Sequence, residues 1–224
     1  MPIIKRAVVL TAAQIRHLIR VTEVDSRQPE RDVVVLLLGH ATGLRISETA
    51  QITVADLFFK NGRLRNEASV RGAISKGNRQ RCIYLTSARL IAAIDRYAAY
   101  RLANGIGITM DASYRGLQPH QPFVTTRRGA RFSMNLKRRI SESGEQVDYW
   151  AADALQSYVT QLYQRAGLKR SSHSGRRSFG SKILAKSGDM EVVATLLGHS
   201  DIDMAMRYTD VDPRILRQAF IDVI

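Results

Sequence analysis

The chain has 224 residues, of which 45% are hydrophobic and 24% are charged, enough for one sizeable core or two small ones. No run of about eighteen apolar residues occurs, which excludes a membrane-spanning helix, and the short apolar stretch near the N-terminus does not fit a signal peptide. The single cysteine, Cys82, excludes an internal disulfide and a zinc site built from several cysteines. We expect a cytoplasmic protein in which Cys82 is a buried or half-buried strand residue.

The charge balance points to a polyanionic partner. The chain carries 34 Lys and Arg against 20 Asp and Glu, a formal net charge of +14. An excess of this size creates a field that attracts polyanions. The basic residues are dispersed through core-forming sequence rather than gathered in a tail, which favours a folded nucleic-acid-binding protein over a merely soluble basic one. Membrane-surface binding is disfavoured, because no segment is both strongly amphipathic and Lys-rich on one face.

The first third of the chain predicts helices. Thr11 and Gln14 fit a capping box, in which each side chain satisfies a backbone amide of the other. The apolar run Val33 to Leu38 fits either a strand or a buried helix, and its end at Thr42-Gly43 favours the helix. A tight turn follows and leads into a new helix.

Arg45 is expected in the first turn of that helix, between apolar neighbours, with Glu48 three residues later on the same face. An ordinary intrahelical ion pair is the simplest interpretation of the two. The pattern then changes to strands, and Gly77-Asn78 between them indicates a hairpin with Lys76 at its tip. These strands are predicted at 69–71, 73–75 and 82–85.

The remainder of the chain again predicts mainly helices, with one short strand at 123–125 and a surface loop around 141–145. His173 and Arg176 lie three residues apart near a helix start, so one helical turn places both on the same side. Helices are expected at 87–104, 151–166, 172–188, 189–198 and 213–223. The sequence therefore predicts a single α+β domain over residues 1–224, mainly helical, with a small antiparallel sheet.

Six dispersed residues have the chemistry that phosphoryl transfer without a metal needs. Arginines bind nonbridging phosphate oxygens bidentately, and a tyrosine can form a covalent phosphotyrosyl intermediate. A lysine can protonate a departing oxygen, and histidines can accept a proton or donate a hydrogen bond. Each residue alone is more simply structural or solvent-exposed, whereas the complete set favours one site. The six are Arg45, Lys76, His173, Arg176, His199 and Tyr208.

Five short sequence boxes occur in order along the chain: residues 42–48 (TGLRISE), 75–77 (SKG), 173–177 (HSGRR), 197–200 (LGHS) and 207–209 (RYT). Their residue types, order and spacing resemble the catalytic domain of the tyrosine recombinase (phage integrase) family, from about residue 10 to residue 210. The resemblance implies that fold and a site-specific DNA recombinase, which cleaves a strand to a 3′-phosphotyrosyl intermediate and rejoins it to a partner strand.

The resemblance also implies a role for each residue. Arg45 and Arg176 would clamp the phosphate, Lys76 would be the general acid and Tyr208 the nucleophile. The family needs neither metal nor ATP, so no cofactor is expected.

The same resemblance implies two further catalytic residues, both histidines, and one supporting glutamate. His173 would be a general base or a phosphate donor, and His199 a further phosphate donor. Glu48 matches the acidic residue that buttresses the first arginine.

Two departures from the family pattern bear on how the chain works. The family usually carries an N-terminal helical domain that completes a clamp around DNA, whereas the catalytic pattern here begins almost at Met1. The chain would be either a minimal recombinase, as short fimbrial-type invertases are, or a domain of something longer. Residues 136–153 look like additional sequence, expected as an idle surface loop, with contact to DNA or a partner as the alternative. Gly175 stands where leucine is frequent, with no functional change attached to it.

The expected partner is double-stranded DNA, with a dimer on each site, a tetramer across two sites and accessory DNA-bending proteins. The helix at 213–223 resembles a segment that docks onto a neighbouring protomer. Two other functions remain open: a type IB topoisomerase-like enzyme that relaxes DNA, and a DNA-binding regulator without catalysis. Integration, excision, inversion and dimer resolution are not distinguished.

Overall fold

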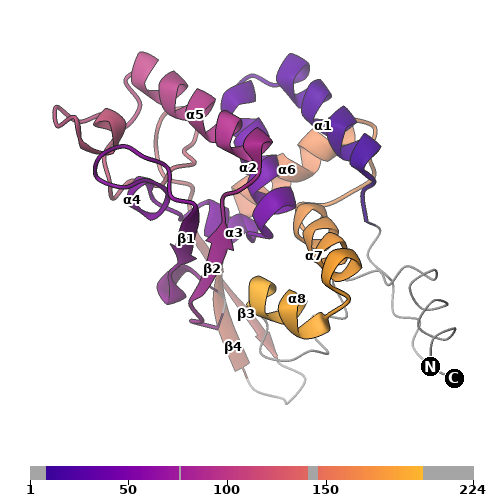
Figure 1. Ribbon diagram of the computed structural model, residues 1–224. Helices are drawn as coiled ribbons and strands as arrows, with labels where there is room; N and C mark the ends of the chain where they lie inside the picture. The colour runs from indigo at the N-terminus through magenta and orange to yellow at the C-terminus, as the bar shows by residue number, and fades with distance from the viewer. Residues whose placement is uncertain (1–8, 76, 141–145, 199–224) are drawn as a thin grey trace, which may run out of the picture.

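The computed structural model describes residues 9–75, 77–140 and 146–198, which form mainly helices with two short antiparallel hairpins (Figure 1). Two single 3-10 turns, Gly72–Ile74 and Ser113–Gly116, lie in connecting segments. The strands are β1 (Glu67–Val70), β2 (Arg81–Tyr84), β3 (Asn135–Ile140) and β4 (Gln146–Ala151). The helices are α1 (Ala12–Asp25), α2 (Pro29–Thr42), α3 (Ile46–Thr49), α4 (Val54–Leu57), α5 (Ala88–Ala103), α6 (Asp153–Arg165), α7 (Ser174–Ser187) and α8 (Met190–Leu197).

Helix α2 is the centre of the helical layer. It packs against α1, α5, α6 and α7, so residues 33–38 are buried on every side of the helix. A run of six apolar residues is stable as a helix here because no face of α2 meets water. Pro29 occupies the first turn, and Gly43 ends the helix in the left-handed conformation, at φ 68°. The predicted helix is confirmed, as is the capping box of Thr11 and Gln14 on α1.

The hairpin of β1 and β2 differs from the prediction in its connection. Ala68 pairs with Ile83 and Val70 with Arg81, in antiparallel register. Residues 73–75 are not a strand, because residues 72–74 form a 3-10 turn and lengthen the loop between the strands. The expected burial of Cys82 is also wrong. Alternate side chains of β2 point to opposite faces, so Arg81 is buried and Cys82 is exposed.

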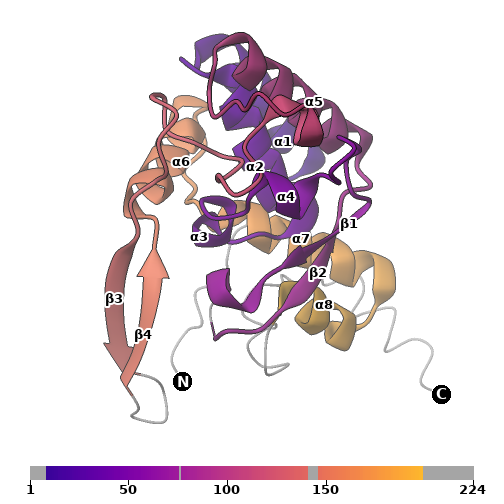
Figure 2. The same cartoon turned by 90° about the vertical axis from the view of Figure 1, so that its left-hand side faces the viewer.

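Residues 135–140 and 146–151 form the second antiparallel strand pair, rather than the idle loop expected for 136–153. Strands β3 and β4 pair from Asn135–Ala151 to Ile140–Gln146, and Figure 2 shows the ribbon projecting away from the helices. Leu136 pairs with Trp150 on its outer face, where the two side chains are 54% and 56% exposed. These two stretches are therefore sheet, and their outer face carries the exposed Leu136 and Trp150 beside the Arg138–Asp148 ion pair.

Residues 123–125 are extended but form no strand, which corrects the expectation of one there. The backbone N–H of Phe123 donates to the carbonyl of Ile52 over 2.7 Å, and Thr53 and Pro122 form an isolated bridge. Phe123 and Val124 are fully buried. Their β-type sequence pattern thus reflects burial under α5 and not membership of a sheet.

The predicted fold class, mainly helical α+β with little antiparallel sheet, is confirmed. No helix within the described ranges is long and apolar enough to cross a membrane.

Helices α2 and α7 approach closely where two glycines meet. A Cβ atom added to Gly175 would lie 3.1 to 3.3 Å from backbone atoms of Gly39 and His40. A Cβ atom added to Gly39 would meet only the Cα of Gly175, at an ordinary 3.7 Å. A leucine at position 175 would therefore force the two helices apart. The close packing of α2 and α7 explains why glycine stands at this position, which the sequence alone did not reveal.

We expect Gly175→Ala to lower the free energy of unfolding by about 1 kcal/mol, because overpacking against α2 backbone exceeds the gain in helix propensity. Gly39→Ala is the matched control on the other side of the same contact, and it should leave stability unchanged or raise it. Urea unfolding followed by circular dichroism measures both. Equal effects of the two substitutions would contradict the asymmetry of the contact.

Candidate active site

Arg45 lies at the sharp junction between α2 and α3. Gly43 ends α2, and Arg45 is the N-cap residue of α3, one position before the first turn in which it was predicted. Its neighbours Leu44 and Ile46 are buried, whereas the Arg45 side chain remains 14% exposed. The backbone is thus anchored on both sides, and the guanidinium group reaches the surface.

Glu48 fixes the conformation of Arg45 from within α3. Its Oε2 accepts a hydrogen bond from the backbone N–H of Arg45 at 2.7 Å, and its Oε1 accepts one from Arg45 Nη1 at 2.8 Å. The Glu48 side chain is fully buried. The intrahelical pair predicted from spacing is therefore present.

A second arginine, Arg81 of β2, binds the same carboxylate. Its Nη1 donates to Glu48 Oε1 at 2.8 Å and its Nη2 to Oε2 at 2.5 Å, a bidentate pair. Burial alone would raise the pKa of Glu48, but the hydrogen bond and charge of Arg81, with the charges of Arg45 and Arg176, lower it to about 2. Glu48 is therefore ionised at neutral pH.

Arg176 is buried in the first turn of α7 and holds two helix ends together. Its Nη1 donates to the carbonyl of Gly43 at 2.5 Å, and its Nη2 donates to the carbonyl of Leu197. Gly43 follows the last turn of α2, and Leu197 is the last residue of α8. A cation is favourable at such carbonyls because they carry the negative end of the helix dipole.

The structure therefore places two of the predicted residues, Arg45 and Glu48, in direct contact, and the charge of a third, Arg176, acts on the same carboxylate. His173 is the exposed N-cap residue of α7, three positions before Arg176. The other predicted residues, Lys76, His199 and Tyr208, lie outside the described residues, as does the helix expected at 213–223.

Sequence reasoning missed Arg81. The strand pattern held the signal, because Arg81 and Ile83 alternate with the exposed Cys82 and Tyr84 and so share the inward face of β2. An arginine on the buried side of a strand needs an anion, and Glu48 is that anion.

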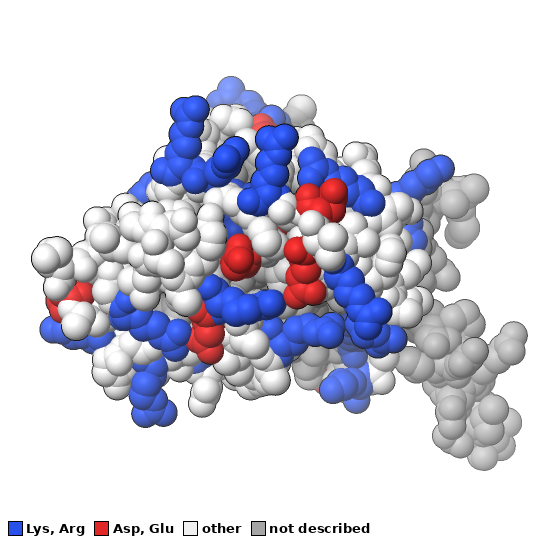
Figure 3. Space-filling view, turned by 90° about the horizontal axis from the view of Figure 1, so that it is seen from above, with Lys and Arg blue, Asp and Glu red and all other residues white. Residues whose placement is uncertain are grey.

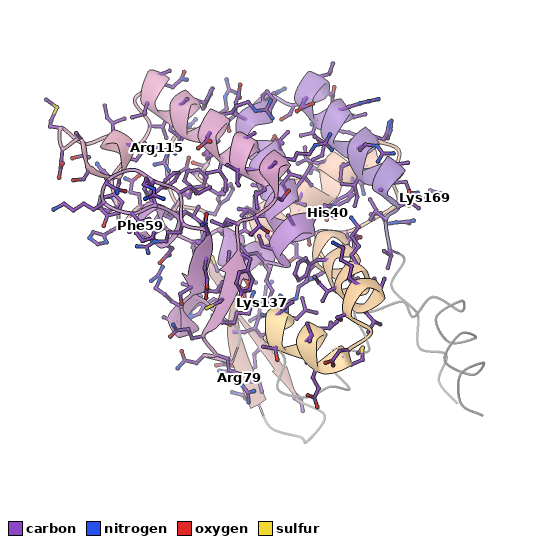
Figure 4. All side chains as sticks on the ribbon, viewed as in Figure 1. His40, Phe59, Arg79, Arg115, Lys137 and Lys169 are labelled. Atoms are coloured by element: carbon purple, nitrogen blue, oxygen red, sulfur yellow. The ribbon has the colours of Figure 1, made fainter. Side chains whose placement is uncertain are left out.

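A buried pair beneath α7 was also missed. His40 of α2 lies within the helical layer (Figure 4), and its Nε2 is 2.9 Å from the Tyr163 hydroxyl of α6. Burial, together with the charge of Lys182, lowers the pKa of His40 to about 3. Burial raises the pKa of Tyr163, which the backbone N–H of Gly175 opposes. Both side chains are therefore neutral at pH 7 and lie against the helix that carries Arg176.

One face of the molecule carries more basic than acidic side chains (Figure 3). Figure 3 shows Lys and Arg side chains distributed over the face seen from above, with fewer Asp and Glu among them. Within the described ranges, His, Cys, Asp and Glu form no group of three or more that could hold a metal ion. The cluster of Arg45, Arg81 and Arg176 around Glu48 can bind an anion through its arginines.

Comparison with known proteins finds a family and related chains. The phage integrase family profile matches residues 8–214. The tyrosine recombinase XerA of Pyrococcus furiosus is 28% identical over 213 residues, which cover 94% of this chain and 59% of the relative. The tyrosine recombinase XerD of Yersinia pestis is 27% identical over 212 residues, covering 93% and 59%. This chain thus spans about three fifths of the length of these relatives.

Solved structures show the same fold. A crystal structure of XerA recombinase superimposes with a TM-score of 0.67 at 18% identity, over 97% of this chain and 63% of that one. XerH site-specific recombinase, solved as a post-cleavage complex with a palindromic difH substrate, gives a TM-score of 0.62 at 17% identity, over 96% and 52%.

Replacing Glu48 by glutamine should lower the free energy of unfolding at pH 7 by about 3 to 5 kcal/mol, because the buried Arg81 loses its counter-charge. Glu23→Gln removes a surface partner of Arg96 and should change stability by under about 1 kcal/mol. Urea unfolding of the two variants makes the comparison. A loss of similar size in both would show that burial of the Glu48 carboxylate is unimportant.

His40 should make the protein sensitive to mild acid. A histidine has an unfolded pKa of about 6.5, and the folded pKa of His40 is lowered to about 3. The unfolded state therefore binds the proton first, and the stability that this ring contributes above pH 6.5 is lost as the pH falls toward 3. We expect a loss of about 2 kcal/mol between pH 7 and pH 5 in the wild type. His40→Gln should lack this loss of stability, whereas a substitution of the exposed His120, His120→Gln, should retain it. Urea unfolding at pH 7 and pH 5 measures the free energy of unfolding of each variant.

Proposed function

Because the chain belongs to the phage integrase family, we propose that it contains the catalytic domain of a site-specific DNA recombinase, which cleaves and rejoins DNA strands through a tyrosine. The observation that carries the proposal is the cluster of Arg45, Arg81 and Arg176 around one buried, ionised glutamate. Three cations and one anion leave a net charge of +2. An anionic phosphate is the complement of such a cluster.

The phosphodiester would bind with its nonbridging oxygens toward Arg45 and Arg176. Arginine suits this task because its charge persists at any working pH and its donors match two oxygens at once. The pentacovalent transition state carries more negative charge on those oxygens than the ground state does. Donors fixed in advance by Glu48 and by the carbonyls of Gly43 and Leu197 therefore stabilise the transition state preferentially.

The bond changes follow from the remaining predicted residues. Tyr208 Oη attacks the scissile phosphorus and loses its proton to a base, for which His173 is the candidate. The bond to the 5′ oxygen breaks, and Lys76 donates a proton to that oxygen. A 3′-phosphotyrosyl bond replaces the broken phosphodiester, so its energy is kept for rejoining to a partner strand. His199 would donate a further hydrogen bond to the phosphate.

The proposed partner is double-stranded DNA, since base pairs present the phosphates in two tracks that a basic surface can follow. Strand exchange needs two sites, so we propose a dimer on each site and a tetramer in synapsis, with the helix at 213–223 docked on a neighbour. DNA-bending proteins would assist where the two sites are far apart.

A covalent adduct with DNA tests the proposal. Nicked duplexes tiled across the DNA that flanks the gene should trap the wild-type chain, because the nick lets the short leaving strand diffuse away. Denaturing electrophoresis detects the adduct, and Tyr208→Phe, which lacks the attacking oxygen, should give none.

Each other result has a definite meaning. No adduct from the wild type on any duplex would leave a DNA-binding regulator as the better account. An adduct that survives Tyr208→Phe would show that another residue is the nucleophile. A plasmid that carries two copies of the DNA site on which the adduct forms then distinguishes two activities. A recombinase gives recombinant products, whereas a topoisomerase-like enzyme gives relaxed plasmid alone.

A further inference from the structure

Arg81 contacts more than its ion-pair partner Glu48, because its side chain also reaches the end of α8. Its side chain is only 4% exposed, yet it lies on β2, a strand of the hairpin whose tip was expected to present Lys76. Its two terminal nitrogens bind both oxygens of Glu48. It also contacts the end of α8, because a Cβ atom on Gly198 would lie 3.0 Å from Arg81 Cδ. One side chain thus joins β2, α3 and the end of α8.

The bidentate pair determines how Arg45 can bind Glu48. Arg81 occupies both carboxylate oxygens, and Arg45 shares Oε1 through a single nitrogen, Nη1. The Nε and Nη2 atoms of Arg45 make no hydrogen bond or ion pair with any residue that the structure describes. Since an arginine has five N–H donors in a planar fork, most of the donors of Arg45 remain available to an incoming anion.

We propose that Arg81 is a positioning residue for Arg45, which it holds open for the phosphate by occupying Glu48. The proposal rests on the function proposed above. Without Arg81, the buried and ionised Glu48 would be left with Arg45 as its nearest cation. Arginine and carboxylate prefer a two-point geometry, so Arg45 would turn to bind both oxygens. The donors that face the phosphate would then be used internally, and the net charge of the cluster would fall from +2 to +1.

A structural readout tests the proposal without any activity. In a crystal structure of Arg81→Met, the Arg45 guanidinium should bind both oxygens of Glu48. A guanidinium that keeps its single contact through Nη1 would overturn the proposal, whether or not the chain cleaves DNA. Arg81→Lys serves if the methionine variant does not fold, because an ammonium group cannot cover two oxygens as a fork does.

A kinetic readout separates positioning from folding. On a nicked duplex that traps the wild type, Arg81→Lys should form the adduct more slowly, by up to the roughly 10²-fold that one preorganised donor contributes. On the same duplex with a methylphosphonate at the scissile position, which removes one negative charge, the deficit should largely disappear. An equal deficit on both substrates would mean that Arg81 has only a structural role. Arg31→Lys is the matched control, since Arg31 is another buried, carboxylate-paired arginine, and it should show no such dependence.

A double variant tests the direction of the effect. In Arg81→Met with Glu48→Gln, no buried carboxylate remains to capture Arg45, and the two remaining arginines restore a net charge of +2. Adduct formation should be faster than in Arg81→Met alone. A double variant that is slower than the single variant would show that Arg81 does not act by occupying Glu48. Absence of an adduct with the wild type itself would count against the proposed function, and the crystal structure of Arg81→Met would still decide the role of Arg81.

Discussion

The close contact between α2 and α7 is the constraint on which the arginine cluster depends. With no side chain at Gly175, the two helices come near enough for Arg176 to reach the carbonyl of Gly43 and that of Leu197. A longer separation would leave a buried guanidinium group short of its acceptors, and burying a charge without partners is strongly unfavourable. The Arg176 side chain thus holds the ends of α2 and α8 together, and the close approach of α7 to α2 makes this possible.

Positive and negative charges around Glu48 do not balance, because three arginines surround one carboxylate. Glu48 is surrounded by positive charge, so its own burial is compensated several times over. Three arginines face this one carboxylate, and Arg45 is the one whose side chain reaches the surface, where it is 14% exposed. Structural ion pairs elsewhere, such as Arg31 with Asp32, are balanced one to one. The cluster of Arg45, Arg81 and Arg176 differs from those pairs because it holds three positive charges around one negative charge.

The sequence predicted the helices and the Arg45–Glu48 pair because these depend on local signals, whereas Arg176 was grouped with them only through the family resemblance. Caps, apolar periodicity and short motifs act over a few residues. It failed for Arg81, whose partner is 33 positions away, and for the strand expected at 123–125, where burial by distant elements imitates a strand pattern. It also failed at 135–151, because polar residues alternating with Leu136 and Trp150 suggest a solvent-exposed loop as readily as an exposed ribbon. The missing information in each case was tertiary.

The exposed ribbon of β3 and β4 also determines what optical spectroscopy of this protein reports. Trp150, the single tryptophan of the chain, lies on its outer face and is 56% exposed. Intrinsic tryptophan emission therefore monitors the surroundings of the ribbon, roughly as a fluorescent label placed there would. A blue shift of that emission indicates that a molecule has covered the ribbon. Loss of the helical core, in contrast, changes this emission only as far as it uncovers the part of the Trp150 side chain that the fold still shields.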